Sequence, residues 1–302
     1  MLKIRTAWLA SFLLASAAGY GDDKWPDLPY TWVADWPALP AEWNFGEVPG
    51  VAVDAKDNVY VFNRSPHPLM QFTSSGKFVR SLLEGMVTSA HGVRIDQEGN
   101  IWVADHNGHV VLKLNPAGRI MMVLGRRDNP GTTETNFNRP TDVAVAPTGE
   151  IYVSDGYGNS RVMKFGRDGR FLAQWGQKGS APGEFNLPHS IVLDVAGQVY
   201  VADRENHRIQ IFTADGKFVK EWKGFGSPWG LAITPDGEIF MADGYANRVL
   251  KLAPDGRVLG ALGSPGKLPG QFAFAHHLAV GKRGELYVAE ILNWRVQKFV
   301  PK

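Results

Sequence analysis

Hydrophobic and polar positions recur along this chain in six units of similar design. Each unit begins with a short run in which apolar and polar residues alternate, turns at Gly or Asn, and returns through a strand of the form aromatic-Val-x-Asp. An Asn-x-Arg-Val-x-Lys-Phe-like segment and a final apolar stretch follow. The second-strand aromatic residues are Tyr60, Trp102, Tyr152, Tyr200, Phe240 and Tyr287, spaced by 42, 50, 48, 40 and 47 residues. These spacings are typical of propeller blades.

Each unit predicts four short strands, and the third unit shows the pattern clearly. It has alternating residues at 142–145, a turn at 147–149, a returning run at 151–154, a third strand at 161–165, a turn at 167–169 and a fourth strand at 171–175. Asp-Gly and Glu-Gly turns between alternating runs indicate hairpins. One such sheet cannot bury both faces, so the units must stack around an axis. The sequence therefore predicts an all-β fold, a six-bladed β-propeller, whose last blade is closed by a strand from residues 25–47.

The length, composition and net charge of the chain limit the kinds of protein that it can be. The chain has 302 residues, 44% of them hydrophobic and 21% charged, with a formal net charge of +2. This profile fits one sizeable core, so we expect a single, monomeric propeller domain over residues 20–302. The small net charge gives no indication of a nucleic-acid partner. Because the chain has no cysteine, a metal would need nitrogen or oxygen ligands.

The N-terminus has the features of a targeting segment. Lys3 and Arg5 precede an apolar run at 7–14, and small residues follow at 16–19. This order predicts a signal peptide over residues 1–19, so we expect export to the periplasm or the outside of the cell. The apolar run is too short to cross a bilayer, so we expect no membrane span. A retained amphipathic anchor is the alternative interpretation.

Three segments resemble NHL repeats. They are 155-DGYGNSRVMKF-165, 203-DRENHRIQIF-212 and 243-DGYANRVLKL-252. The resemblance implies a six-bladed propeller. Since many NHL proteins are not enzymes, it implies little about chemistry.

One position in the repeats carries a pattern of its own. Eleven residues before the second-strand aromatic lie Pro49, His91, Thr141, His189, Trp229 and His276. Histidine occupies alternate units, which lie about 120° apart around a six-bladed ring, so we expect the three imidazoles to converge on the axis. Three protein ligands with one open position are typical of catalytic zinc, although imidazole also suits copper, nickel and iron. We therefore predict a divalent metal site, preferably for zinc, at His91, His189 and His276.

The other histidines share no repeated position. They are His67, His106, His109 and His207, which we expect to be surface residues, and His277. Because His277 directly follows His276, strand alternation predicts that the two side chains point in opposite directions.

Six motifs taken together resemble the peptidyl-α-hydroxyglycine α-amidating lyase family. They are 61-VFNR-64, 91-HGVRID-96, 139-RPTDVAV-145, 155-DGYGNSR-161, 188-PHSIVL-193 and 203-DRENHR-208. The resemblance runs over roughly residues 44–300 and implies a zinc ion on His91, His189 and His276. It also implies cleavage of the C–N bond of a carbinolamide, which gives an amide and glyoxylate.

The same resemblance implies roles for three further residues. Tyr157 corresponds to the tyrosine that removes the substrate's hydroxyl proton, and Arg64 corresponds to an arginine beside that tyrosine. Arg208 corresponds to an arginine that helps to hold the substrate's carboxylate. Arginine also recurs at the position of Arg208 in other units, at Arg161, Arg248 and Arg295. A packing role within the blade is therefore the alternative interpretation of Arg208.

The chain departs from the family at two positions near its third histidine. Phe274 stands where the family has Met, and His277 replaces an acidic residue that is associated with a structural calcium. The family's disulfides are absent as well. The resemblance therefore does not extend to a calcium ion.

Three functions fit these observations, in this order. The first is a metal-dependent lyase that acts on a small-molecule or peptide substrate bearing a carboxylate. The second is a non-catalytic NHL propeller that binds a peptide or polymer. The third is a metal-dependent propeller hydrolase of the lactonase type, a class that uses Glu, Asp and Asn where this chain offers histidines.

Overall fold

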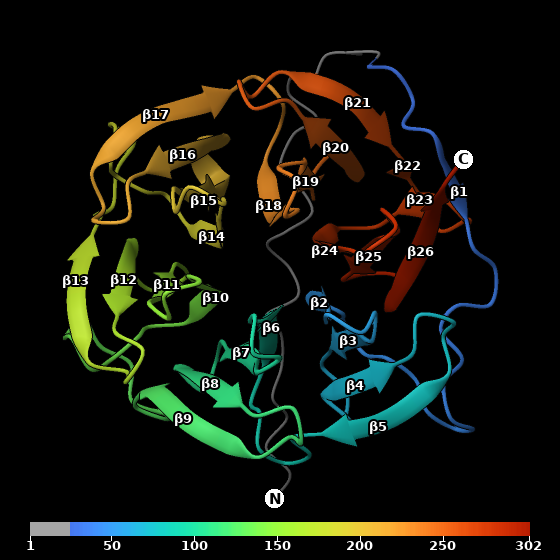
Figure 1. Cartoon of the computed structure of the whole chain (residues 1–302), viewed down its shortest axis with the longest axis horizontal. Coiled ribbons are helices and arrows are strands. Elements are labelled where there is room, and N and C mark those ends of the chain that lie inside the picture. The colour runs from blue at the N-terminus through green and yellow to red at the C-terminus, as the bar shows by residue number, and fades with distance from the viewer. Residues whose placement is uncertain (1–24) are drawn as a thin grey trace, which may run out of the picture.

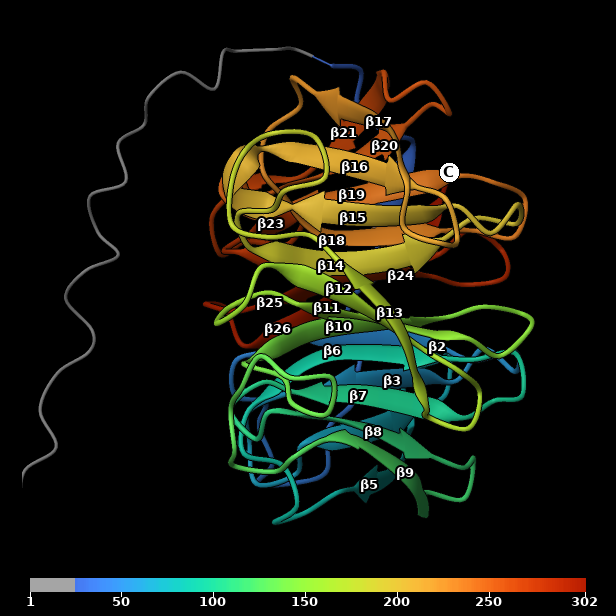
Figure 2. The same ribbon diagram turned by 90° about the vertical axis from the view of Figure 1, so that its left-hand side faces the viewer.

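The computed structural model describes residues 25–302, which form six four-stranded antiparallel sheets around a central axis (Figure 1). The predicted all-β, six-bladed β-propeller is confirmed. Seen from the side, the loops lie at the two faces of the ring, where the strands end (Figure 2). The predicted signal peptide lies outside the described residues.

In blades one to five the strands follow one another from the axis outward in chain order, while blade six ends on the N-terminal strand β1. Blade one comprises β2 (Gly50–Val53), β3 (Val59–Phe62), β4 (Leu69–Phe72) and β5 (Phe78–Leu82), and blade two comprises β6 (Ala90–Ile95), β7 (Ile101–Asp105), β8 (Val110–Leu114) and β9 (Ile120–Gly125). Blade three comprises β10 (Pro140–Val145), β11 (Ile151–Asp155), β12 (Arg161–Phe165) and β13 (Phe171–Trp175).

Blades four to six complete the ring. Blade four comprises β14 (Pro188–Leu193), β15 (Val199–Asp203), the 3-10 helix η1 (Arg204–Asn206), β16 (Arg208–Phe212) and β17 (Phe218–Lys223). Blade five comprises β18 (Pro228–Ile233), β19 (Ile239–Asp243), β20 (Arg248–Leu252) and β21 (Val258–Leu262). Blade six comprises β24 (Ala275–Val280), β25 (Leu286–Glu290), β26 (Arg295–Pro301) and the N-terminal strand β1 (Tyr30–Trp32), while β22 (Ser264–Pro265) and β23 (Gln271–Phe272) form a short parallel pair beforehand.

The repeated aromatic residues fill the wedges between neighbouring blades. All six side chains are at most 6% exposed. Tyr60 of blade one packs in one cluster with Val93 of blade two, and Tyr287 of blade six packs in another with Val51 of blade one. Because burial of a large apolar side chain contributes about 1.5–3 kcal/mol, this repeated position secures every contact between blades.

An acidic residue at the end of the second strand ties each site-bearing loop to its blade. Asp155 accepts a hydrogen bond from the backbone N–H of Asn138 (2.8 Å), and Asp203 accepts one from that of Asn186 (2.7 Å). Both acceptor carboxylates are buried. The loop before the first strand and the loop after the second strand are therefore joined at the face of the ring that carries the histidines. No helix among the described residues is long and apolar enough to cross a membrane.

The N-terminal segment closes the ring, as the sequence predicts. Strand β1 pairs with β26 in antiparallel register, and both strands come from opposite ends of the described chain. Next to this pair, the backbone N–H of Val33 donates to Lys298 O (2.9 Å), and that of Lys302 donates to Pro29 O (2.8 Å). Blade six is therefore held by hydrogen bonds between the two ends of the propeller.

Val33→Pro should weaken this closure. Proline has no N–H, so the bond to Lys298 O is lost and that carbonyl loses a partner. We expect the free energy of unfolding in urea to fall by about 1–3 kcal/mol beyond the change in Val33→Ala, which keeps the N–H. Equal stability of the two variants would show that this bond contributes nothing to closure.

Candidate metal centre

Three histidines from alternate blades meet on the propeller axis. His91, His189 and His276 are each the second residue of an innermost strand, on β6, β14 and β24. Their ligand nitrogens lie within 4.8 Å of one another, and the side chains are almost fully buried. The ring centroids are 4.8, 4.8 and 4.7 Å apart, with interplanar angles of 71°, 71° and 68°. The three imidazoles therefore converge on the axis, as predicted, and their arrangement is close to three-fold symmetric.

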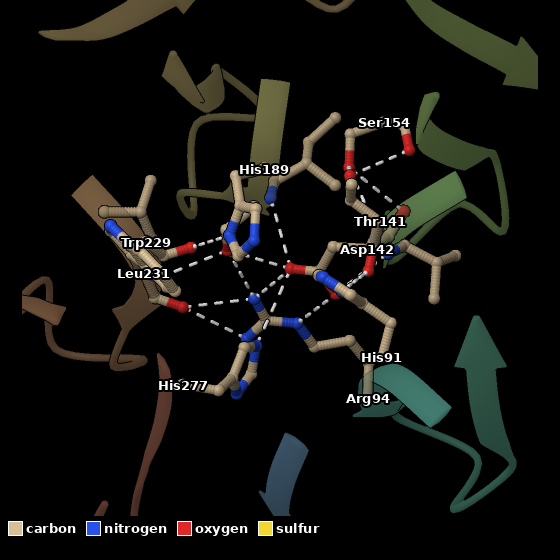
Figure 3. Close-up of polar contacts among 12 residues, drawn as sticks. His91, Arg94, Thr141, Asp142, Ser154, His189, Trp229, Leu231 and His277 are labelled. Carbon is tan, nitrogen blue, oxygen red and sulfur yellow. Dashed lines mark hydrogen bonds and ion pairs between the residues drawn. The ribbon is translucent and has the colours of Figure 1, made fainter. Parts of the chain in front are cut away.

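A backbone carbonyl of the neighbouring blade orients each imidazole, and Figure 3 shows two of these pairs, His91 with Thr141 and His189 with Trp229. Because a carbonyl oxygen can only accept, Nδ1 carries the hydrogen in each ring and Nε2 keeps its lone pair. The acceptors are the other three members of the repeated position, which the sequence did not single out. The pairs are His91 with Thr141 O (2.6 Å), His189 with Trp229 O (2.7 Å) and His276 with Pro49 O (2.7 Å).

The electrostatics of the cluster keep the imidazoles neutral. Burial lowers the pKa of all three histidines well below the usual value of 6.5. The neighbouring His276 lowers the pKa of His91 further, while Arg204 does so for His189 and Arg64 for His276. Neutral nitrogens with oriented lone pairs are what a divalent metal needs from histidine. The three residues therefore fit such an ion, whether zinc, copper, nickel or iron.

A β-bulge falls at the repeated position in five of the inner strands. In β24 the register shifts between Ala275 and His277, and β6, β10, β14 and β18 shift at the corresponding place. A bulge re-aims side chains, so alternation fails there. The Nε2 atom of His277 lies 3.7 Å from Asp142 Oδ2 in the opposite blade. The prediction that the side chains of His276 and His277 point in opposite directions is therefore wrong, because both lie in the channel.

The hydroxyl group of Tyr157 lies directly against the histidine cluster. It is 3.1 Å from Nε2 of His189 and 3.4 Å from Nε2 of His91. Tyr157 follows β11 in the sequence Gly-Tyr-Gly, and the two glycines allow a close approach to neighbouring loops. A Cβ atom on Gly156 would lie 2.0 Å from Pro188 O, and one on Gly158 would lie 2.1 Å from the Asn138 side chain. The motif therefore brings the phenol over the open side of the three imidazoles.

Arg204 is the arginine that contacts this tyrosine. Its Nη1 donates to the Tyr157 hydroxyl oxygen (3.2 Å) and its Nε donates to Glu205 (2.8 Å). The guanidinium stacks over the ring of Trp229 at 4.5 Å from the ring centroid. The side chain is 7% exposed, so its charge acts with little screening. Sequence reasoning missed Arg204 because it is the first residue of η1 and has no repeated counterpart.

Arg64 lies on the other side of the cluster, in the loop after β3. Its Nε donates to Ala90 O (3.1 Å), next to His91, and its Nη1 forms an ion pair with Glu47. Arg64 therefore borders the site, but the arginine that hydrogen-bonds Tyr157 is Arg204 and not Arg64, which the family resemblance places beside the tyrosine.

The prediction that His106 is a surface residue is wrong. Its ring centroid lies 4.7 Å from that of Tyr157 and 5.7 Å from that of His91. Burial, assisted by the charge of Arg64, lowers the pKa of His106 to about 3. His106 is a fourth imidazole beside the cluster. No repeated pattern marks it, because only one unit carries histidine at this place.

Three other histidines lie away from the cluster. His207 is exposed at the end of η1. His67 is partly buried, and its ring stacks on Trp43 at 3.3 Å between centroids. His109 is also partly buried, and its Nδ1 accepts a hydrogen bond from the backbone N–H of Arg139 (3.1 Å).

Comparison with known proteins shows that this chain is similar to propellers built from NHL repeats. Residues 137–165 and 185–212 match the NHL repeat. The chain is 34% identical to peptidyl-glycine α-amidating monooxygenase B of Xenopus laevis, over 88% of this chain and 35% of that protein. It is 34% identical to NHL repeat-containing protein 3 of Mus musculus, over 83% of this chain and 78% of that protein. It is 46% identical to the probable peptidyl-α-hydroxyglycine α-amidating lyase of Caenorhabditis elegans, over 32% of this chain and 28% of that protein.

The chain belongs to the peptidyl-α-hydroxyglycine α-amidating lyase family. It spans about a third of the length of the frog monooxygenase. Among solved structures, a streptogramin B lyase superimposes with a TM-score of 0.66 at 15% identity, covering 90% of this chain and 98% of that one, which shows the propeller fold alone. The second NHL match contains His189, Arg204 and Arg208.

Arg208 does not have the role that the family resemblance implies. Its side chain is 1% exposed and forms ion pairs with Asp203 (2.7 Å) and Glu221 (2.8 Å). Its two Nη atoms donate to the carbonyls of Ser180, Ala181 and Glu184. No N–H group of Arg208 is therefore left to bind a substrate. Arg208 stabilises its blade as Arg161 stabilises blade three. Each arginine lies on the third strand of its blade and faces the aspartate that ends the second strand.

The metal content of purified protein tests the histidine cluster. We expect one divalent ion per chain in the wild type and almost none in His189→Ala, because two imidazoles hold an ion far more weakly than three. Elemental analysis measures both. His67→Ala, which removes a histidine far from the cluster, should keep its metal. A wild type without stoichiometric metal would contradict the site.

Arg208→Met tests the structural role of that arginine. Loss of the guanidinium leaves the buried carboxylate of Asp203 without its partner, so the free energy of unfolding should fall by about 3–5 kcal/mol. Urea unfolding measures the change, with Arg170→Met on the exposed surface as the control. A variant as stable as the control would contradict the assignment.

Proposed function

We propose that this chain is a zinc-dependent lyase that cleaves the C–N bond of an α-hydroxyglycine-like carbinolamide, giving an amide and glyoxylate. The observation that carries the proposal is the Tyr157 hydroxyl, within hydrogen-bond distance of two metal-binding nitrogens and of the Arg204 guanidinium. A phenol in this position can take the proton of a substrate's hydroxyl group, and a metal held by the histidines would make that proton easier to remove. The names of the family members support the same reaction.

Charge around the cluster favours an anionic substrate. Arg64 and Arg204 flank the three histidines, and their positive charge lowers the pKa of His276 and His189. Glu47 neutralises Arg64 only in part, because their side chains are 39% and 30% exposed, respectively. Guanidinium groups bind carboxylates with paired hydrogen bonds. We therefore propose that these two arginines attract the carboxylate of the substrate.

Tyr157 performs the proton transfer in this proposal. Its oxygen takes the proton of the substrate's hydroxyl group, the freed electron pair forms the carbonyl of glyoxylate, and the C–N bond breaks. The proton held by Tyr157 then passes to the departing amide nitrogen, so atoms and charge balance. Arg204 donates a hydrogen bond to the tyrosine oxygen and stabilises negative charge on it. A zinc ion, which His91, His189 and His276 would hold, would supply Lewis acidity to the substrate's hydroxyl oxygen.

The substrate we propose is a peptide or small molecule that ends in this carbinolamide and its carboxylate. We also propose that the protein is exported, on the basis of the charged, apolar and small residues that succeed one another over 1–19. An exported enzyme would meet substrates outside the cytoplasm.

Tyr157→Phe tests the proton transfer. An acylated dipeptide that ends in α-hydroxyglycine is the substrate, and released glyoxylate is measured. Because general base catalysis contributes about 10²–10⁴-fold, we expect kcat to fall by that factor while zinc content stays at the wild-type level.

Tyr245→Phe is the matched control. Tyr245 occupies the corresponding loop of blade five, and its hydroxyl donates to Glu205 rather than approaching the histidines. We expect this variant to keep most of its activity. A wild type that binds the peptide and zinc but releases no glyoxylate would support the non-catalytic NHL propeller instead.

A further inference from the structure

One long charged side chain crosses the channel directly below the histidines. Three residues after the repeated position, five of the inner strands carry Ala or Val, at Ala52, Ala144, Val192, Ala232 and Ala279. Blade two carries Arg94 at this place. The small residues leave room at the axis, and the Arg94 side chain extends through it from β6 to Leu231 of β18, three blades away (Figure 3).

The guanidinium of Arg94 is surrounded by oxygen acceptors. Its Nε donates to Asp142 Oδ1 (3.1 Å) and its Nη2 donates to Asp142 Oδ2 (2.5 Å), so the pair is bidentate. Nη2 also donates to Ser190 Oγ (3.0 Å), and both Nη atoms donate to Leu231 O (3.1 Å). Ser190 Oγ donates in turn to Asp142 Oδ2 (2.8 Å). The carboxylate, hydroxyl and carbonyl come from three different strands.

His277 connects this network to the remaining strand. Its Nδ1 donates to Val51 O (3.2 Å), and its Nε2 faces Asp142 Oδ2 at 3.7 Å. We call these groups the channel plug. Its members are Val51 of β2, Arg94 of β6, Asp142 of β10, Ser190 of β14, Leu231 of β18 and His277 of β24. The plug therefore joins all six innermost strands.

The buried carboxylate of Asp142 requires a cation. Its side chain is 1% exposed, and burial by itself raises the pKa of this carboxyl group, but the charge of Arg94 outweighs burial and holds the pKa well below its usual value. A buried carboxylate without a partner is strongly destabilising. Arg94 thus neutralises the negative charge of Asp142, which the fold places at its centre.

Calcium does not fit this place. Calcium binds six to eight oxygen ligands, chiefly carboxylates, carbonyls and waters. Here both oxygens of Asp142, the hydroxyl of Ser190 and the carbonyl of Leu231 already accept hydrogen bonds from Arg94. The guanidinium occupies the space that an ion would need.

We propose that Arg94 is a built-in cation that fastens the six inner strands below the metal centre, so that this chain needs one metal ion and no calcium. Arg94 also lines a hollow of about 730 Å³ at the opposite mouth of the channel, so the plug lies between this hollow and the histidines. Access to the histidines is therefore from the face that carries Tyr157. This inference does not rest on the proposed lyase activity.

Thermal unfolding of Arg94→Ser tests the plug. Removing the guanidinium leaves Asp142 buried and unpaired, so we expect Tm to fall by about 10 °C. The vacated carboxylate, hydroxyl and carbonyl are oxygen donors that suit calcium. Millimolar calcium should therefore restore several degrees of Tm in Arg94→Ser, and none in Arg94→Ser combined with Asp142→Asn.

The wild type provides the decisive comparison. Calcium should leave its Tm unchanged, and elemental analysis should find no calcium in it. Arg119→Ser, which removes an exposed arginine from a turn, should melt like the wild type. Arg94→Lys, which keeps the charge without the bidentate geometry, serves if Arg94→Ser does not fold, and its Tm should lie below that of the wild type. Calcium in the wild type, or an unchanged Tm in both Arg94 variants, would overturn the proposal.

Discussion

Three hydrogen bonds between neighbouring blades are the constraint on which the candidate metal centre depends. Each runs from an imidazole Nδ1 to a backbone carbonyl in the next blade. The bond does two things at once, because it couples adjacent blades and fixes which nitrogen of each ring faces the axis. The acceptor is a main-chain group, so it is set by the fold and not by the side chain that happens to occupy the neighbouring blade.

The β-bulges next to these bonds give the channel its two layers. Without an extra residue in the strand, His276 and His277 would lie on opposite faces. With it, the first residue faces the metal centre and the next contributes to the plug beneath. A neutral cluster of nitrogen donors therefore rests on a layer in which one positive and one negative charge cancel. This separation keeps the charge of Asp142 paired with Arg94, away from the metal-binding nitrogens.

The loops at the face of the ring complete the site because acidic residues inside the blades hold them in place. Asp155 and Asp203 bind backbone N–H groups of the preceding loops, and Tyr157 and Arg204 follow these acids within two residues. A phenol and a guanidinium carried by separate blades are thereby held 3.2 Å apart. The rigid blades therefore hold the reactive side chains at the axis in fixed positions.

The sequence by itself determined the parts of this protein that repeat. The spacing of Tyr60 and its counterparts fixes six blades, and alternate histidines at one position place His91, His189 and His276 on the axis, because equivalent residues of a closed ring must face its centre. The Gly-Tyr-Gly motif likewise marks Tyr157 through its family resemblance.

Only the tertiary structure decided the roles of residues that occur once. Arg204 and Arg208 are four residues apart, yet one touches Tyr157 and the other is enclosed in its blade, because η1 turns the chain between them. The direction of His277 follows from a bulge, which alternation along the sequence does not show. The role of Arg94 depends on its partners Asp142 and Leu231. These residues lie 48 and 137 positions away in the sequence, and only ring closure brings them together.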